Sequence, residues 1–293
     1  MVHRGAGARG GITLIQANHE RTQRNISKRR GEEHPPIRLL AHLRVFLPHR
    51  PPRARRREET LRAWNFLRDL PALPRVADIG CGCGSSALLL AGECGAQVTA
   101  VDLFPHFLEQ VNERAAQLGI ATGDKVVGQG CPGIVTLEAD MAALPFAEGQ
   151  FDVVWSEGAV YNLGYARALE LWKPFVKQGG YVAVTDVVWL HPERDAEVEK
   201  FWQEAYSEVS GVGEKFAAME ARGYEPVASF VLPRHCWEEN FYYPQRKAQQ
   251  DFLAAHPGNA FAAELVQNQR HEASLYERFG NTYGYAFFIG RKR

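Results

Sequence analysis

Beyond residue 57, apolar residues recur in blocks whose spacing alternates between that of helices and that of strands. From Glu58 to Leu70 they recur every three or four positions, which predicts an amphipathic helix. Later blocks are short apolar runs separated by helical stretches, a pattern that predicts a mostly parallel sheet with helices on both faces. The predicted strands are 75–79, 97–101, 133–138, 152–155 and 180–187, and the helices between them include 85–93, 106–118 and 164–176.

The pattern changes after residue 190. Residues 192–222 are predicted to be helical, with a sixth strand at 226–232 and a final strand at 283–290. About fifty residues separate these two strands and include helical runs at 245–255 and 259–279. Because ligands of such sheets bind at the carboxyl ends of the strands, we expect this insertion to cover the substrate side.

A glycine-rich turn follows the first predicted strand. The sequence there is Gly80-Cys81-Gly82-Cys83-Gly84, and Asp102 ends the second strand about twenty residues later. Glycines let a ligand approach the backbone, and an acid at that distance can bind the two ribose hydroxyls of an adenosine. The fold class predicted is therefore α/β, with a Rossmann-like seven-stranded, mostly parallel sheet and the helical insertion near the C-terminus.

Two residues argue against a dinucleotide-dependent oxidoreductase. The third glycine of that fingerprint is replaced by Ser85, and Asp78 stands just before the turn, where its charge would repel a pyrophosphate. The same carboxylate would attract a ligand ammonium group. An adenosine carrying an amino-acid tail and no phosphate satisfies both observations, so S-adenosylmethionine is the predicted cofactor.

Residues from about 58 to 190 resemble a class I S-adenosylmethionine-dependent methyltransferase. Residues 137–146 are similar to the adenine loop of that family, 151–155 to its fourth strand, and 172–181 to the helix and Gly-Gly turn before its fifth strand. A narrower likeness, to a bacterial subgroup that methylates small molecules, rests on the segments 155–162, 236–237 and 283–288. One departure is Arg53-Ala54-Arg55-Arg56-Arg57, which stands where the family usually has a Gly-Pro-Gly-like approach to the cofactor.

The resemblance implies specific cofactor contacts. Asp78 would lie near the amino group, Asp102 would accept from the ribose hydroxyls, and Leu103 or Phe104 would pack on the adenine. Asp140 would accept from the adenine amino group, although it could instead cap a helix. The residues implied at the cofactor are Asp78, Gly80, Cys81, Gly82, Asp102, Leu103, Asp140, the backbone amide of Met141, and Ser156.

The acceptor side is predicted from the loop after the fourth strand. Glu157 is the candidate catalytic carboxylate, able to hold a cationic amine or to take a proton, and Tyr161 follows on the same loop. The alternative for Glu157 is that it lines a solvated cleft. Trp189, Trp237 and Tyr242 are the candidate substrate contacts, since aromatic walls suit a flat or cationic acceptor, but such side chains also pack cores.

Charge divides the chain at residue 57. Residues 1–57 hold 14 Arg and Lys against 3 acids, whereas 58–293 hold 20 against 31. An acidic body argues against nucleic acid as a partner, except through the basic extension. The extension is predicted to be disordered, and it could be an anionic-surface tail, an organelle-targeting peptide or an over-extended gene start.

Within residues 58–293, a methyltransferase domain, we distinguish a cofactor-binding core at 58–190, the substrate cover and strand six at 191–280, and the final strand at 281–293. Five cysteines without framework spacing predict a reducing, cytoplasmic location. Neither a metal site nor a membrane span is expected. The functions considered are methyl transfer to a small-molecule acceptor or, alternatively, a non-catalytic cofactor-binding or RNA-associated protein. The sequence assigns no oligomeric state.

Overall fold

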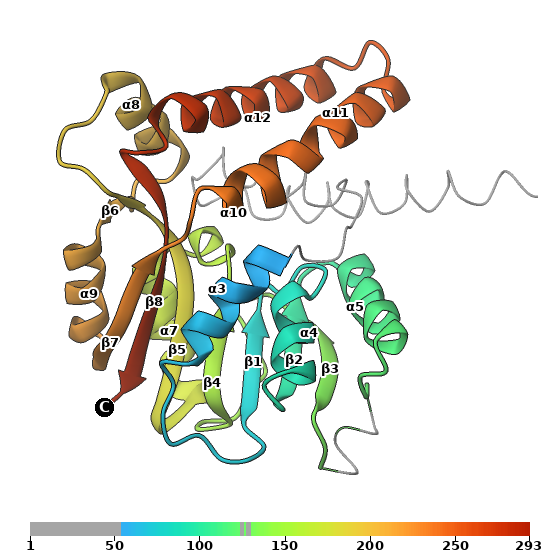
Figure 1. Cartoon of the computed structure of the whole chain (residues 1–293), viewed down its shortest axis with the longest axis vertical. Helices are drawn as coiled ribbons and strands as arrows, with labels where there is room; N and C mark the ends of the chain where they lie inside the picture. Colours follow the sequence, from blue (N-terminus) through green and yellow to red (C-terminus); the bar gives the residue numbers. More distant parts are fainter. Residues whose placement is uncertain (1–53, 124–125, 127–129) are drawn as a thin grey trace, which may run out of the picture. The chain divides into compact units, whose positions relative to one another are not determined.

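The computed structural model describes residues 54–123, 126 and 130–293. Except for its last four residues, the predicted basic extension lies outside this part. The described strands form one sheet in the order β3-β2-β1-β4-β5-β8-β7, with β6 paired to β5 (Figure 1). Their bounds are Arg75–Ile79 (β1), Gln97–Asp102 (β2), Gly133–Glu138 (β3), Phe151–Ser156 (β4), Val176–Trp189 (β5), Ser210–Gly211 (β6), Tyr224–Val231 (β7) and Tyr283–Lys292 (β8).

The predicted α/β class and mostly parallel sheet are confirmed. β1 to β5 pair in parallel, whereas β8 runs antiparallel to both β5 and β7. All seven predicted strands are present. The two-residue strand β6 was not predicted, because a pair of residues is too short to show a period.

Helices connect the strands and cover both faces of the sheet. α3 begins at Ala54 and ends at Trp64, so the predicted helix from Glu58 to Leu70 is displaced toward the N-terminus. The chain after α3 turns through Asp69, which has a left-handed φ of 55°, and that conformation does not continue a helix. The others are Ser85–Gly92 (α4), Pro105–Gln117 (α5), Tyr165–Trp172 (α7), Ala196–Ala205 (α8) and Val212–Ala221 (α9), with 3₁₀ turns at Val160–Asn162 (η1) and Lys173–Phe175 (η2).

Two apolar clusters hold the helices to opposite faces of the sheet. Successive strand residues alternate between them, because side chains of a strand point to opposite faces. Val76 belongs to the cluster that contains residues of α3, α4 and α5, and Ala77 to the cluster that contains residues of α7 and α9. The alternation fixes the register of β1 and hence the position of the glycine turn that follows it.

The predicted C-terminal insertion forms a helical cap. It consists of α10 (His235–Trp237), the π-helix η3 (Glu238–Tyr242), α11 (Tyr243–Ala255) and α12 (Ala260–Phe279). Figure 1 shows α11 and α12 beyond the edge of the sheet at which the parallel strands end. A third cluster, rich in Trp and Tyr, joins the cap and α8 to the ends of β5 and β8. None of the described helices combines the length and apolarity needed to cross a bilayer.

A buried ion pair ties the α9 crossover to the sheet. Lys215 on α9 donates to Asp186 on β5 over 2.5 Å, and the two side chains are 3% and 0% exposed. The hydroxyl of Tyr206 also donates to Asp186, over 3.0 Å. Burial is the largest influence on Asp186 and raises the pKa of its carboxyl, although Lys215 and Tyr206 oppose the rise.

Candidate active site

The glycine turn between β1 and α4 presents an open stretch of backbone. Gly80, Gly82 and Gly84 all have positive φ angles, of 72°, 53° and 77°. A Cβ atom on Gly80 would lie 2.5 Å from the Cβ of Ala159, and one on Gly84 would lie 2.7 Å from a methyl group of Val111. No atom of the residues that the structure describes lies within 4 Å of the corresponding position on Gly82. Gly82 therefore leaves room for a ligand to reach the backbone.

Asp102 holds this turn from the neighbouring strand. Its Oδ2 accepts from the backbone N–H of Gly82 over 2.8 Å, and its Oδ1 accepts from the N–H of Phe104 over 3.0 Å. The N–H groups of Gly80 and Cys81 both donate to the carbonyl of Val101, each over 2.9 Å. The predicted ribose carboxylate and the predicted backbone contacts are thus brought together, because β1 and β2 are adjacent parallel strands.

Two carboxylates, those of Asp78 and Asp102, lie close to the glycine turn. Asp78 is 1% exposed on β1, and both it and Asp102 add to burial in raising the pKa of the Cys81 thiol well above its usual range. The thiol contacts the carbonyl of Gly82 at 3.4 Å. Cys81 is therefore a neutral thiol, in keeping with the prediction that only its backbone faces the cofactor. Leu103 is 46% exposed, which suits the predicted packing on an adenine ring.

The loop after β3 brings Asp140 and Met141 to the same edge. The Asp140 carboxylate accepts from the N–H of Ala142 over 3.0 Å and so caps a local turn, whereas the alternative expected it to cap a helix. The carbonyl of Met141 accepts from the indole N–H of Trp172 over 2.9 Å. The terminal methyl of Met141 would lie 3.2 Å from a Cβ on Gly80, which places this loop against the glycine turn.

Ser156 has a structural bond at the end of β4. It is fully buried, and its hydroxyl donates to the carbonyl of Ile79 over 2.8 Å. This bond fastens the end of β4 to the end of β1. The side chain is thus engaged within the sheet, and its contact with the cofactor stays a prediction.

Glu157 is held by donors from two elements. Its Oε1 accepts from the hydroxyl of Thr60 on α3 and from the indole N–H of Trp155 on β4, each over 2.9 Å. The next residue, Gly158, donates its N–H to the hydroxyl of Thr185 on β5 over 2.6 Å. The predicted carboxylate thus stands at the carboxyl edge of the sheet, on a loop anchored to β5 and with its side chain hydrogen-bonded to α3.

The predicted substrate aromatics gather in the third cluster. Trp189 and Tyr242 are 8% and 5% exposed, and Tyr161 on η1 packs against the same cluster. The ring of Trp237 stacks on those of Tyr242 and Tyr276, with centroids 5.5 Å and 5.4 Å apart. The structure therefore brings these four residues, which come from three separate segments, into one cluster where the cap meets the sheet.

Sequence reasoning missed two polar residues of this region. Glu272 on α12 is 4% exposed, and its carboxylate accepts from the hydroxyl of Tyr242 over 3.1 Å. Thr60 is 1% exposed although α3 lies at the start of the fold. The pattern held a signal for Thr60, because it lies three and four residues before Ala63 and Trp64, on the apolar side of the helix.

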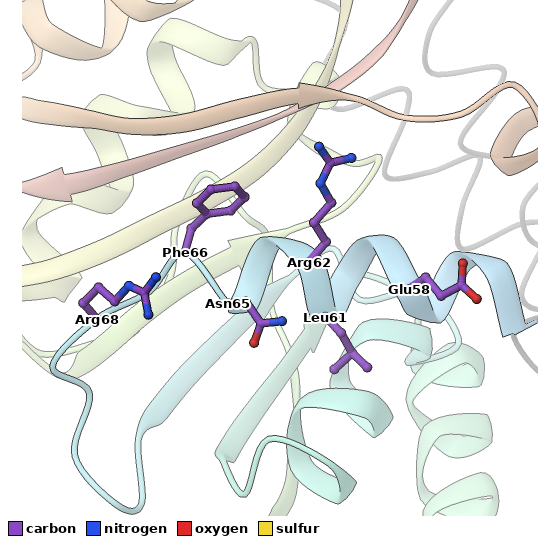
Figure 2. Close-up of a pocket in the computed structure, with 6 residues that line it drawn as sticks. All are labelled: Glu58, Leu61, Arg62, Asn65, Phe66 and Arg68. Carbon is purple, nitrogen blue, oxygen red and sulfur yellow. The ribbon is translucent and has the colours of Figure 1, made fainter.

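A separate hollow runs along α3. Figure 2 shows the side chains around it, which come from this helix and the loop after it. The hollow measures about 430 Å³ and is lined by Glu58, Leu61, Arg62, Asn65, Phe66 and Arg68, none of which is a predicted site residue. No cluster of three metal-binding side chains occurs among the residues that the structure describes.

Residues 77–184 match the family described as "Methyltransferase domain". This part of the chain is a methyltransferase domain. The resemblance found in its motifs is thereby confirmed. The match spans β1 to the middle of β5, and so includes the glycine turn, Asp102 and Glu157.

Curated relatives of this methyltransferase domain are similar over part of their length. A rice protein described as a probable tocopherol O-methyltransferase is 38% identical over 109 residues, which are 37% of this chain and 27% of that protein. A Synechocystis 2-methyl-6-phytyl-1,4-hydroquinone methyltransferase is 30% identical over 187 residues, 58% of this chain and 54% of that protein. The chain thus spans between about a quarter and a half of these two relatives.

Solved structures share the fold of this domain. A methyltransferase from Thiobacillus denitrificans, in complex with S-adenosyl-L-homocysteine, is 23% identical with a TM-score of 0.66, and the match covers 84% of this chain and 94% of that one. The [4+2]-cyclase SpnF is 18% identical with a TM-score of 0.63, covering 80% of each chain. A methyltransferase-like fold therefore also occurs in a protein described as a cyclase.

Proposed function

We propose that this chain transfers a methyl group from S-adenosylmethionine to a small-molecule acceptor. The observation that carries the proposal is the bond from the Gly82 N–H to Asp102, at a glycine whose added Cβ would have no atom of the described part of the chain within 4 Å. An open backbone turn next to a carboxylate suits a ribose better than a diphosphate. Asp78, buried on the preceding strand, adds negative charge that favours a cationic ligand.

The residues present fit S-adenosylmethionine. The turn from Gly80 to Gly82 would hold the methionine and ribose portions, Asp102 the ribose hydroxyls, and Leu103 with the Met141 amide the adenine. When bound, this cofactor supplies an electrophilic methyl group on a sulfonium. The chain itself would then align the acceptor with that group, since positioning alone can lower the barrier by several kcal/mol.

Glu157 would act on the acceptor. It lies at the sheet edge between the glycine turn and the aromatic cluster, and its carboxylate is oriented by Thr60 and Trp155. A carboxylate there could hold a cationic amine or accept a proton from the acceptor as the methyl group is transferred. Tyr161, Trp189, Trp237 and Tyr242 would form the acceptor wall, which suits a flat or cationic molecule.

Partners and location follow from the same features. Both relatives compared above are described as methyltransferases of small molecules, which supports a small-molecule acceptor here. The acidic body is unsuited to nucleic acid, so the RNA-associated alternative would depend on the basic extension. None of the five cysteines, all of which the structure describes, lies in a disulfide, which suits a reducing cytoplasm.

Isothermal titration calorimetry of the full chain tests the donor half of the proposal. S-adenosylhomocysteine should bind at one equivalent per chain, whereas NADH should give no saturable heat. Asp102→Ala should weaken that binding by about 10- to 150-fold, because it removes a charge-assisted hydrogen bond worth about 1.5–3 kcal/mol. Glu113→Ala, an exposed acid on α5, is the matched control. Unchanged affinity in Asp102→Ala would remove the ribose assignment.

A further inference from the structure

Two hydrogen bonds converge on one oxygen of Glu157. The Thr60 hydroxyl and the Trp155 indole N–H both donate to Oε1 over 2.9 Å. Thr60 precedes Glu157 by 97 residues in the sequence, and Trp155 precedes it by two. Two donors at one carboxylate oxygen restrict rotation of the side chain about its last bond. Of the two, Trp155 is fixed by the sheet, because it lies on β4 and is fully buried.

The helix that carries Thr60, α3, packs against the residues around Glu157. Trp64, one turn after Thr60, contacts the ring of Trp155 with centroids 6.3 Å apart. α3 also contacts α4, which follows the glycine turn, and α10, which begins the cap. One face of α3 therefore touches both Trp155 and Glu157, so the helix and the carboxylate are positioned together.

We propose that Thr60 is a positioning residue for Glu157, and that α3 is in this way part of the acceptor site. The inference rests on the proposed role of Glu157. A threonine within a helix commonly bonds the carbonyl one turn before it. Here the hydroxyl instead donates to a carboxylate on the loop after β4, although Thr60 is 1% exposed and could have been a purely apolar position.

Holding the carboxylate in one orientation matters for either role of Glu157. A general base must reach the acceptor's proton at hydrogen-bond distance, and a displacement of about 1 Å can cost up to about 10²-fold in rate. Loss of the hydroxyl should therefore reduce the rate.

Two substitutions separate the hydroxyl from the packing. Thr60→Val keeps the shape and removes the donor, whereas Thr60→Ser keeps the donor and removes a methyl group. Methyl transfer is measured with deuteromethyl-labelled S-adenosylmethionine and a deproteinised bacterial metabolite extract. Thr60→Val should lower the rate of transfer by about tenfold or more, whereas its affinity for S-adenosylhomocysteine should be nearly unchanged. Thr60→Ser should restore most of the rate. Equal rates in both variants would overturn the proposal.

The Trp155 indole provides a readout that does not depend on activity. Its N–H signal in a ¹H–¹⁵N correlation spectrum, assigned with Trp155→Phe, reports the hydrogen bond to Glu157. The signal should move in Glu157→Gln and in Thr60→Val and should keep its native position in Thr60→Ser. An unmoved signal in Thr60→Val would overturn the positioning role, whatever the rates.

The role of Glu157 in the proposed function and the positioning role of Thr60 can be rejected independently. Normal methyl transfer by Glu157→Gln would reject the role of Glu157 in the reaction, and the indole signal would still decide whether Thr60 orients that side chain. Slow transfer by Glu157→Gln together with normal transfer by Thr60→Val would keep the role of Glu157 and reject that of Thr60.

Discussion

Gly82 and Gly84 lie two residues apart in one turn, but an added methyl group would meet different surroundings at each. Both have positive φ, so alanine costs about 1–2 kcal/mol of backbone energy at either position. At Gly84 the methyl would also overlap Val111 and cost about 1–3 kcal/mol more. At Gly82 it would point into open space, where the cofactor is proposed to bind.

We therefore expect opposite rankings in two measurements. In urea unfolding, Gly84→Ala should be the more destabilising variant. In calorimetry with S-adenosylhomocysteine, Gly82→Ala should lose the larger part of its affinity, because its methyl group occupies ligand space. If Gly82→Ala bound the ligand as well as the native chain, the open backbone of the turn would not be the binding surface.

Glu157 can be tested with a change that keeps its shape. Glu157→Gln should lower methyl transfer in the metabolite extract by about 10²-fold or more, the size expected for losing a general base. Affinity for S-adenosylhomocysteine should change far less, since the side chain is proposed to face the acceptor. Glu225→Gln, an exposed acid on β7, serves as the control. A collapse of cofactor affinity with intact folding would instead assign Glu157 to the donor.

At the scale of elements, the packing of α9 against β5 depends on the buried ion pair of Lys215 and Asp186. Lys215→Met should destabilise the fold by about 3–5 kcal/mol at pH 8, because it leaves the Asp186 carboxylate unpaired in the interior. The exposed pair Lys247–Asp251 offers a matched control, and Lys247→Met should cost less than about 1 kcal/mol.

The cost of Lys215→Met should depend on pH. Burial raises the pKa of the Asp186 carboxyl above its unfolded value, and removal of Lys215 takes away a charge that opposes this rise. The folded state then takes up a proton before the unfolded state does, so lowering the pH restores stability to the variant. Urea unfolding of native and variant chains at pH 8 and pH 5 should show a smaller difference at pH 5. A difference independent of pH would contradict an ionised, unpaired Asp186.

Most of the helices and strands could be predicted from the sequence. The runs at 75–79 and 133–138 match β1 and β3 residue for residue, because each is a short run rich in apolar residues that begins directly after a proline. The π-helix Glu238–Tyr242 was missed, and α3 was displaced. Such features depend on contacts across the fold, and local periodicity carries no record of those contacts.

Residues of the candidate site also differ in whether the sequence alone could reveal them. Residues tied to the ends of strands, such as Asp102 and Glu157, could be found because parallel strands end at one edge. Thr60 could not be assigned, since its partner lies 97 residues away. The bond of Ser156 to Ile79 was also hidden, because it depends on β1 and β4 being neighbours in the sheet.

For the whole molecule, the fold by itself does not determine the reaction. A fold of this kind is shared with a methyltransferase complexed with S-adenosylhomocysteine and with a [4+2]-cyclase, both below 25% identity. What would distinguish methyl transfer is the proposed combination of a cofactor-binding turn with Glu157 on the acceptor side. The cap packs its Trp and Tyr side chains against the ends of β5 and β8, near the loop that carries Glu157.

A methyl balance on the full chain tests this account most directly. The chain is incubated with deuteromethyl-labelled S-adenosylmethionine and a deproteinised metabolite extract, and both products are measured by mass spectrometry. The account predicts a metabolite that carries the intact deuterated methyl group and forms in equal amount to S-adenosylhomocysteine. If S-adenosylhomocysteine binds at one equivalent but no labelled methyl group leaves the donor in any extract, the chain is a cofactor-binding protein and the account is wrong.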